Sequence, residues 1–183
     1  MRIMLEIEVP DRDLWDENKE EFISIKGCTL HLEHSLVSLS KWESKWCKAF
    51  LTNREKTKEE QLDYIRCMTL DKHVDPRVYT ILTNSNIEKI NDYMAAPMTA
   101  TRFFDEKKAL GSKSDVITSE LIYYWMITLN IPVEFEKWHL TRLITLIKVC
   151  NVKNNPKKMS RGEIMRRNKS MNAARKMRLN TKG

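Results

Sequence analysis

The sequence predicts a mainly α-helical protein with a small N-terminal β element, an α+β fold with a multi-helix compact body and a basic C-terminal helix. Three observations predict it. Residues 3–9 alternate apolar and polar side chains with a period of two, which is typical of a half-buried strand. Further along, apolar residues recur at intervals of three and four, the spacing of amphipathic helices. Helix-capping residues recur through the chain, and together these signals predict five to seven helices.

The N-terminal β element is expected to contain a strand over residues 3–9 and then a hairpin. Residues 11–20, DRDLWDENKE, are polar and predict a turn or a short irregular link. The segments EFISI and CTLHLEH follow, separated by Lys26 and Gly27. Two β-prone segments around such a pair predict a hairpin that turns at Lys26-Gly27.

The first helix is predicted where the apolar period changes from two to between three and four. Ser40 and Glu43 have the spacing of a capping box, and Ser35 and Ser38 offer earlier starts. The apolar stripe that this helix would bury consists of Leu36, Leu39, Trp42, Trp46 and Phe50.

Similar signals predict the later helices, and each cap stabilises its helix by about 1 kcal/mol. The two most apolar segments, Leu121–Leu129 and Phe135–Cys150, are expected to be the buried centre, because a helix that is apolar nearly all round is usually buried. Residues 105–115 predict an exposed loop. The capping signals are Thr57 with Glu60, Asp75 before Pro76, Ser85 with Glu88, Thr118, the break at Ile131-Pro132, and Ser160 with Glu163.

The charge of the chain is divided unevenly along its length. The whole chain has a net charge of +7. Residues 151–183 contain eleven Lys and Arg and one acid, a net charge of +10, so residues 1–150 have a net charge of −3. We therefore expect an α-rich globular body with an N-terminal hairpin or short sheet over 1–150, and a basic helical tail over 151–183. This uneven distribution of charge gives information about binding partners and none about the fold.

Composition and motifs exclude several classes of protein. A chain with 42% hydrophobic and 31% charged residues is typical of a soluble globular protein. Its apolar runs are too short for a membrane span, and its acidic start lacks the order of a signal peptide, which predicts a cytosolic protein. Neither nucleotide-binding glycine motif occurs, so no cofactor is expected. The four cysteines form no CxxC pair and are expected to be reduced and mostly buried.

The stretch HLEHSLVSLSKWESKW contains the most suggestive candidates for chemistry, His31 and His34. If residues 28–33 form a strand, the two side chains have opposite parity and point to opposite faces. No HExxH and no GxSxG motif occurs, and paired acids such as Glu134 and Glu136 suit the first turn of a helix. We therefore expect no metal site and no catalytic site, with the histidines bound to backbone groups.

Two features suggest a surface that binds partners. Trp42 and Trp46 are expected to be core anchors, with partner binding as the alternative. The basic tail could neutralise phosphates, dock on an acidic protein or stay solvated, and it lacks aromatic residues for base stacking, which makes nucleic acid the less favoured partner. The candidate partner-binding residues are Trp42, Trp46, Arg166, Arg167, Lys169, Met171, Arg175, Lys176 and Arg178.

Long strings of the sequence carry a resemblance to a known family. They include LEHSLVSLSKWESKW, KTKEEQLDYIRCMTL, MTATRFF, ITSELIYYWMITLNIPVEFEKWHLTRLITLIKVCN and the ending MNAARKMRLNTKG. These strings resemble small proteins of tailed bacteriophages that are encoded among the tail genes, in the place of the tail assembly chaperone. The resemblance extends from about Thr29 to Gly183, and its strings mark no chemical site.

The resemblance implies a non-enzymatic role in the cytoplasm of the host cell. Such chaperones bind the long helical tape-measure protein, keep it soluble, help to recruit the major tail protein, and are absent from the finished particle. Two alternatives stay open: a structural neck or tail component of the virion, and a nucleic-acid-binding protein that acts through residues 157–178. The oligomeric state is left open as well.

Overall fold

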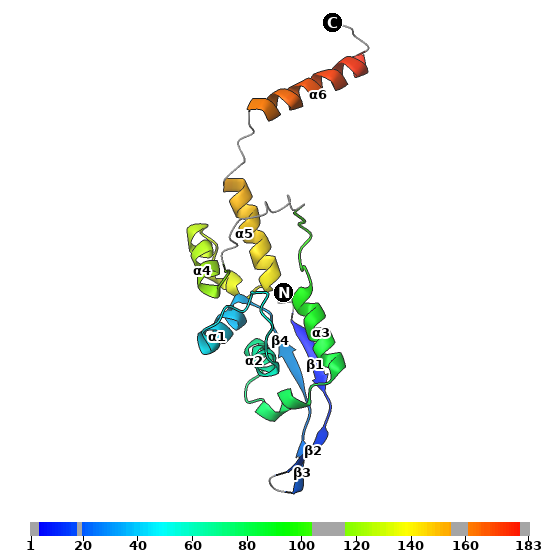
Figure 1. The fold of residues 1–183 in the computed structure, drawn as a ribbon, viewed down its shortest axis with the longest axis vertical. Helices are drawn as coiled ribbons and strands as arrows, with labels where there is room; N and C mark the ends of the chain where they lie inside the picture. The colour runs from blue at the N-terminus through cyan, green and yellow to red at the C-terminus, as the bar shows by residue number, and fades with distance from the viewer. Residues whose placement is uncertain (1–3, 18–19, 104–115, 155–160, 180–183) are drawn as a thin grey trace. The chain divides into compact units, whose positions relative to one another are not determined.

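The computed structural model describes residues 4–17, 20–103, 116–154 and 161–179. The chain divides into two units, Met1–Lys148 and Val149–Gly183, and each is described by itself. The first unit contains four short strands followed by helices, and the second contains the basic helix α6 (Arg161–Leu179). The predicted mainly α-helical fold with a small N-terminal β element is confirmed (Figure 1).

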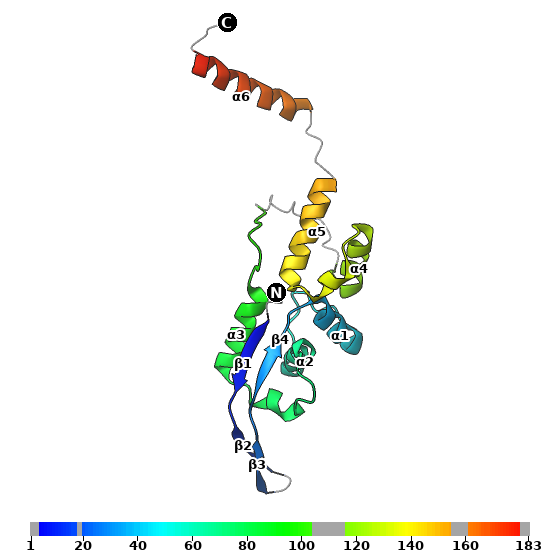
Figure 2. The same ribbon diagram turned by 180° about the vertical axis from the view of Figure 1, so that it is seen from behind.

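The four strands form two antiparallel pairs that follow one another along a single long hairpin. β1 (Leu5–Val9) pairs with β4 (Cys28–Leu32), and β2 (Arg12–Asp16) pairs with β3 (Glu21–Ile25). Figures 1 and 2 show β2 and β3 continuing outward from β1 and β4. The predicted N-terminal strand is confirmed. The predicted irregular link over residues 11–20 is wrong, because it contains β2.

Gly27 explains why the predicted turn at Lys26-Gly27 is also wrong. The backbone N–H of Gly27 donates to Asp11 Oδ1 at 2.7 Å, so the pair lies opposite the β1–β2 junction, in the middle of the hairpin. A Cβ atom on Gly27 would lie 1.9 Å from the carbonyl oxygen of Val9. Glycine therefore permits the close approach of the two chains between one strand pair and the next.

One face of the β1–β4 pair is apolar and forms part of the core. Ile7, Val9, Leu30 and Leu32 are buried, whereas the alternate residues are exposed or partly exposed. The helix α3 (Asn84–Ala95) packs on β1, and Asn86 donates a side-chain hydrogen bond to the backbone carbonyl of Glu8 at 3.1 Å. Both ribbon views place α2 (Lys58–Met68) beside β4 and α3 beside β1 (Figure 2).

The helix starts agree with the predicted caps only in part. α1 (Leu36–Trp46) begins at the earlier candidate, where Ser35 and Ser38 form the capping box. Thr57 and Glu60 cap α2 reciprocally, as predicted. The predicted Ser40–Glu43 box does not form, because both residues lie inside α1.

At two further helix starts, one predicted cap forms and the other does not. Asp75 caps the 3₁₀ helix η1 (Pro76–Ile81) by accepting from the Arg77 N–H, as predicted. The start of α3 is two residues earlier than predicted, since Thr83 and Asn86 form its capping box in place of Ser85 and Glu88.

The last part of the body departs most from expectation. Thr118 caps α4 (Ser119–Thr128), as predicted. The single helix predicted after Pro132 is wrong: η2 (Val133–Lys137) and α5 (Leu140–Asn154) are separated by an extended Trp138.

The prediction that these segments form the buried centre is also wrong. α4 exposes Tyr124 and Ile127, and η2 has no buried residue. The centre of the core instead joins the strands to α1 and α2, with α3, α4 and α5 each contributing one face. The large side chains that are less than 2% exposed include Trp42, Tyr64, Ile7, Leu30, Leu32, Leu36, Leu39, Met68, Ile81, Ile90, Ile122, Leu140 and Leu143.

Three further expectations can be compared with the structure. The predicted loop over residues 105–115 and the capping residue Ser160 lie outside the described residues. All four cysteines are free, as expected. The expectation that they are mostly buried is wrong, because Cys47 is exposed and the other three are partly buried.

The contact at Gly27 predicts the effect of adding one methyl group. Gly27→Ala is expected to lower the free energy of unfolding by about 1–3 kcal/mol, because the added Cβ would overlap the Val9 carbonyl and force the strands apart. Gly162→Ala is the matched control, since its Cβ position has no atom within 4 Å apart from its chain neighbours and the adjacent helix backbone. Thermal or urea unfolding of the full chain measures both. Equal stability of the two variants would contradict the proposed close approach.

Candidate functional site

The two tryptophans of α1 have different environments. Trp42 is completely buried, and its Nε1–H donates to the backbone carbonyl of Glu60 at 2.9 Å. Its ring stacks with that of Trp46 and lies edge-on to Phe50, with centroid separations of 5.9 and 5.0 Å. The interpretation of Trp42 as a core anchor is confirmed. A completely buried indole offers no surface to a partner in this structure.

Trp46 is only partly buried and keeps a solvent-facing edge. Its Nε1–H donates to Asp63 Oδ2 at 2.8 Å, and Lys45 donates to the other carboxylate oxygen of Asp63. The ammonium groups of Lys45 and Lys48 lie 5.8 and 5.5 Å from the Trp46 ring. Of the two tryptophans, Trp46 is therefore the one that a partner could reach, at the edge of a positively charged surface.

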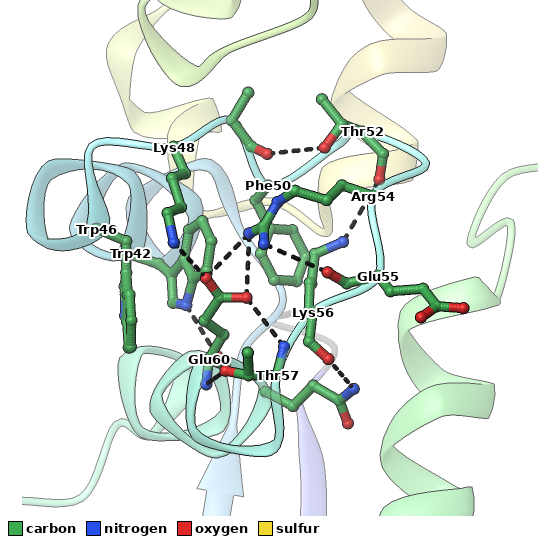
Figure 3. A network of polar contacts seen from close by, with 12 residues as sticks. Trp42, Trp46, Lys48, Phe50, Thr52, Arg54, Glu55, Lys56, Thr57 and Glu60 are labelled. Atoms are coloured by element: carbon green, nitrogen blue, oxygen red, sulfur yellow. Dashed lines mark hydrogen bonds and ion pairs between the residues drawn. The ribbon is translucent and has the colours of Figure 1, made fainter.

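A buried carboxylate organises the loop that follows α1 (Figure 3). The Glu60 side chain is 1% exposed and accepts hydrogen bonds from Lys48 at 2.9 Å, from Arg54 at 3.0 Å and from the backbone N–H of Thr57 at 3.0 Å. The bonds from Lys48 and Arg54 lower the pKa of Glu60 to about 2. Glu60 thus stays ionised and holds residues 48–57 against α2.

Glu43 is a second buried carboxylate with a connecting role. One of its oxygens accepts from the Phe50 backbone N–H at 2.9 Å, and the other accepts from the Ser119 N–H at 2.7 Å. It therefore fixes the loop after α1 and the first turn of α4 at the same time. The sequence predicted a capping role for Glu43. It could not predict the bond to Ser119, because Ser119 is far away in the sequence.

A groove lies between α2 and α3, with a volume of about 520 Å³. We call it the α2–α3 groove. Both helices line it, and residues of η1 and of the loop before α2 also contribute to its lining. Sequence analysis missed this groove because periodicity identifies apolar stripes but not the distance between the helices that carry them. Its lining residues include Phe50, Lys56, Lys58, Leu62, Ile65, Tyr79, Leu82, Ile87, Ile90 and Met94.

The candidate residues of the tail lie on α6 and are all exposed. Met165, Met171 and Met177 are 67%, 52% and 87% exposed. At about 100° of rotation per residue, the basic side chains are distributed around the whole helix, and so are the methionines. α6 therefore has no single apolar or basic face. Those candidate residues are Arg166, Arg167, Lys169, Met171, Arg175, Lys176 and Arg178.

His34 and His139 lie beside each other in the interior, whereas His31 has a separate, partly exposed position. His31 lies on β4 and bonds through Nδ1 to the Asp71 carboxylate at 2.9 Å, and this hydrogen bond raises its pKa. His34 is buried, and its Nδ1 forms a hydrogen bond with the Tyr64 hydroxyl at 2.7 Å. His139 donates from Nε2 to the Tyr93 carbonyl at 3.0 Å. The prediction that the histidines bind backbone groups is confirmed for His139. It is wrong for His31 and His34, whose rings bond to the side chains of Asp71 and Tyr64.

Burial favours the neutral forms of His34 and His139. Desolvation, together with the neighbouring His139, lowers the pKa of His34 to about 3. Desolvation also lowers the pKa of His139, against the opposing effect of its bond to Tyr93. The two rings are 5.1 Å apart, so a proton on either one would be buried beside the other.

Metal binding and membrane insertion can each be judged from the residues that the structure describes. Among these residues, no group of three or more His, Cys, Asp or Glu side chains is placed to hold a metal ion. None of the described helices combines the length and the apolar character needed to cross a membrane.

Comparisons with known proteins add no relative to this description. No protein-family model, curated protein or solved structure matches the chain.

The buried histidines predict a loss of stability in mild acid. Between pH 6.5 and 5, His34 alone is expected to lower the free energy of unfolding by about 1.1 kcal/mol per pH unit on average. The free energy of unfolding falls with the pH because His34 of the unfolded chain binds a proton at the ordinary pKa of 6.5, whereas folded His34 stays neutral down to about pH 3. His139 acts in the same direction. Urea unfolding at several pH values in this range measures the slope.

Two variants separate His34 from the rest of the titration. His34→Gln is expected to remove its share of the slope, because glutamine takes up no proton. His31→Gln is the matched control: the raised pKa of His31 stabilises the fold below pH 6.5, and this contribution is lost only as the pH rises. The slope between pH 6.5 and 5 should be unchanged in the control. An unchanged slope in His34→Gln would show that His34 is not the group responsible.

Proposed function

We propose that this protein is a non-enzymatic assembly chaperone of a tailed bacteriophage. It binds the tape-measure protein in the cytoplasm of the host cell, keeps it soluble, and helps to recruit the major tail protein during tail assembly. The observation that carries the proposal is the resemblance of residues 29–183 to proteins encoded in that place among phage tail genes. The protein acts by binding alone and leaves before the particle is complete.

Two exposed surfaces of different character support a role in binding. The α2–α3 groove presents apolar side chains between two helices. The helix α6 presents basic and methionine side chains on all sides, and flexible thioethers adapt to irregular apolar surfaces. Exposed charge pairs are weak and screened by salt, so contacts through α6 would be released readily once assembly proceeds.

Co-expression with the tape-measure protein of the same phage tests the proposal. The full chain is expected to keep that protein in the soluble fraction and to co-purify with it. A chain that lacks residues 151–183 is expected to recover less of it, and the complex of the full chain should weaken as salt rises. A tape-measure protein that stays equally insoluble with and without the full chain would contradict the proposal. Abundant peptides of this chain in purified particles would favour a structural virion component instead.

A second candidate function is binding of nucleic acid through α6. The favouring observation is that seven basic side chains are exposed along this helix, which contains one acid in the sequence. If six of them contact phosphates, affinity for duplex DNA should fall about a thousandfold between 50 and 200 mM salt. Fluorescence anisotropy at the two salt concentrations measures this fall. Binding that survives deletion of residues 151–183 would contradict a role for α6.

A further inference from the structure

The α2–α3 groove is lined by one stripe from each of its two helices. On α2 the lining residues include Lys58, Gln61, Leu62 and Ile65, which are spaced at i, i+3, i+4 and i+7, and Tyr64 beside them. On α3 they include Asn84, Ile87, Asn91 and Met94, again three or four residues apart. Such spacing places each set on one side of its helix. Two helices therefore turn these sides toward a shared space, and that space remains open.

Apolar side chains occupy the middle of the groove. Leu62, Leu82, Ile87 and Met94 pack on the core but are only partly buried. Beneath them lie Tyr64, Ile65 and Ile90, which are 5% exposed or less. A partner that covered these four side chains would remove apolar surface from water without moving the core, which favours binding. The groove thus has a preformed floor and an adaptable upper rim.

The charge at one end of the groove has a definite sign. Lys56 and Lys58 line it, and no carboxylate does so among the residues that the structure describes. The Lys56 ammonium lies 4.6 Å from the centroid of the Phe50 ring, and it donates to the Thr52 carbonyl at 3.5 Å. Burial, and then the nearby Arg54, lowers the pKa of Lys56, so an added negative charge would stabilise its ionised form.

We propose that the α2–α3 groove binds one amphipathic helix of a partner protein, with its apolar stripe on Leu62, Leu82, Ile87 and Met94 and acidic side chains beside Lys56 and Lys58. This inference rests on the proposed function, under which the helix belongs to the tape-measure protein. α2 and α3 contain 11 and 12 residues, which is about 16–18 Å at 1.5 Å per residue. The groove therefore matches about three turns of helix, with anchors at i, i+3 or i+4, and i+7.

The sign of the charge selects among helical partners. A helix with acidic residues flanking its apolar stripe gains favourable interactions with both lysines, whereas a basic helix meets like charges at the same place. Apolar contact supplies affinity, and the lysines select the partner and its direction along the groove. Added salt is expected to reduce only the contribution of the two lysines to the affinity of the complex.

The test measures dissociation constants between the full chain and overlapping fragments of the tape-measure protein, each fused to maltose-binding protein for solubility. The bound fragments are expected to contain a helix with an apolar stripe and flanking acids. Leu62→Glu and Lys58→Glu should each weaken their binding at least about tenfold. Lys58→Glu preserves the fold, because an acid in the first turn of α2 interacts favourably with the positive helix end.

Two matched controls place equal changes outside the groove. Ile127→Glu alters an apolar side chain of α4 that is 76% exposed, and Lys89→Glu alters an exposed lysine of α3 that does not line the groove. Both should bind the fragments as the unmodified chain does. Equal binding by the groove variants and the controls would overturn the groove and leave the proposed function standing, and preferred binding of basic helices would overturn the acidic partner.

The remaining outcomes separate the groove from the proposed function. If the intact tape-measure protein is retained but no fragment binds, a single helix is not the occupant, and the groove proposal fails alone. If neither the intact protein nor any fragment is bound, the proposed function fails, and its assignment of the groove fails with it.

Discussion

The buried carboxylate of Glu60 is the interaction on which the arrangement around α2 depends. It receives an ammonium, a guanidinium and a capping N–H, while the carbonyl of the same residue accepts the indole N–H of Trp42. An ionised carboxylate is stable at 1% exposure only if its charge is paired and its oxygens accept hydrogen bonds. Lys48, Arg54 and Thr57 must therefore stay in place, and the loop between α1 and α2 stays with them.

This constraint reaches the surface that we propose to bind a partner. Phe50 and Lys56 lie in the loop that Glu60 holds, and both line one end of the α2–α3 groove. Glu43 fixes the backbone of Phe50 from the other side by accepting its N–H. Two buried acids thus position an aromatic ring and a lysine at the groove. A substitution of Glu60 would therefore change both partner binding at the groove and the stability of the fold.

The α2–α3 groove and the segment that contains it differ in the sign of their charge. Residues 1–150 have a net charge of −3, yet the groove in that segment is lined by two lysines and, among the described residues, by no acid. The tail has a net charge of +10. Both candidate binding surfaces therefore favour acidic partners, although neither could be inferred from the charge of the body. Binding by surfaces of this kind agrees with the role of an assembly chaperone that we propose.

Several features could be predicted from the sequence because they depend on neighbours three or four residues away. The strand β1, the burial of Trp42 in the stripe of α1, and the Thr57–Glu60 cap follow from periodicity and capping chemistry. The exposure of the basic residues on α6 agrees with their composition, because charged side chains are rarely buried without partners.

Other features depended on which segments meet in space. The same alternation of side chains allows β3 to pair with β2 or with β4, and the close approach at Gly27 accompanies the first choice. An apolar helix such as α4 could be covered on every side, but its neighbours cover only one. Glu43 bonds to Ser119, 76 residues away, and the α2–α3 groove exists because two stripes face each other without closing. Local sequence determined the elements and their faces, whereas tertiary packing decided which faces were covered, because burial depends on contacts between residues far apart in the chain.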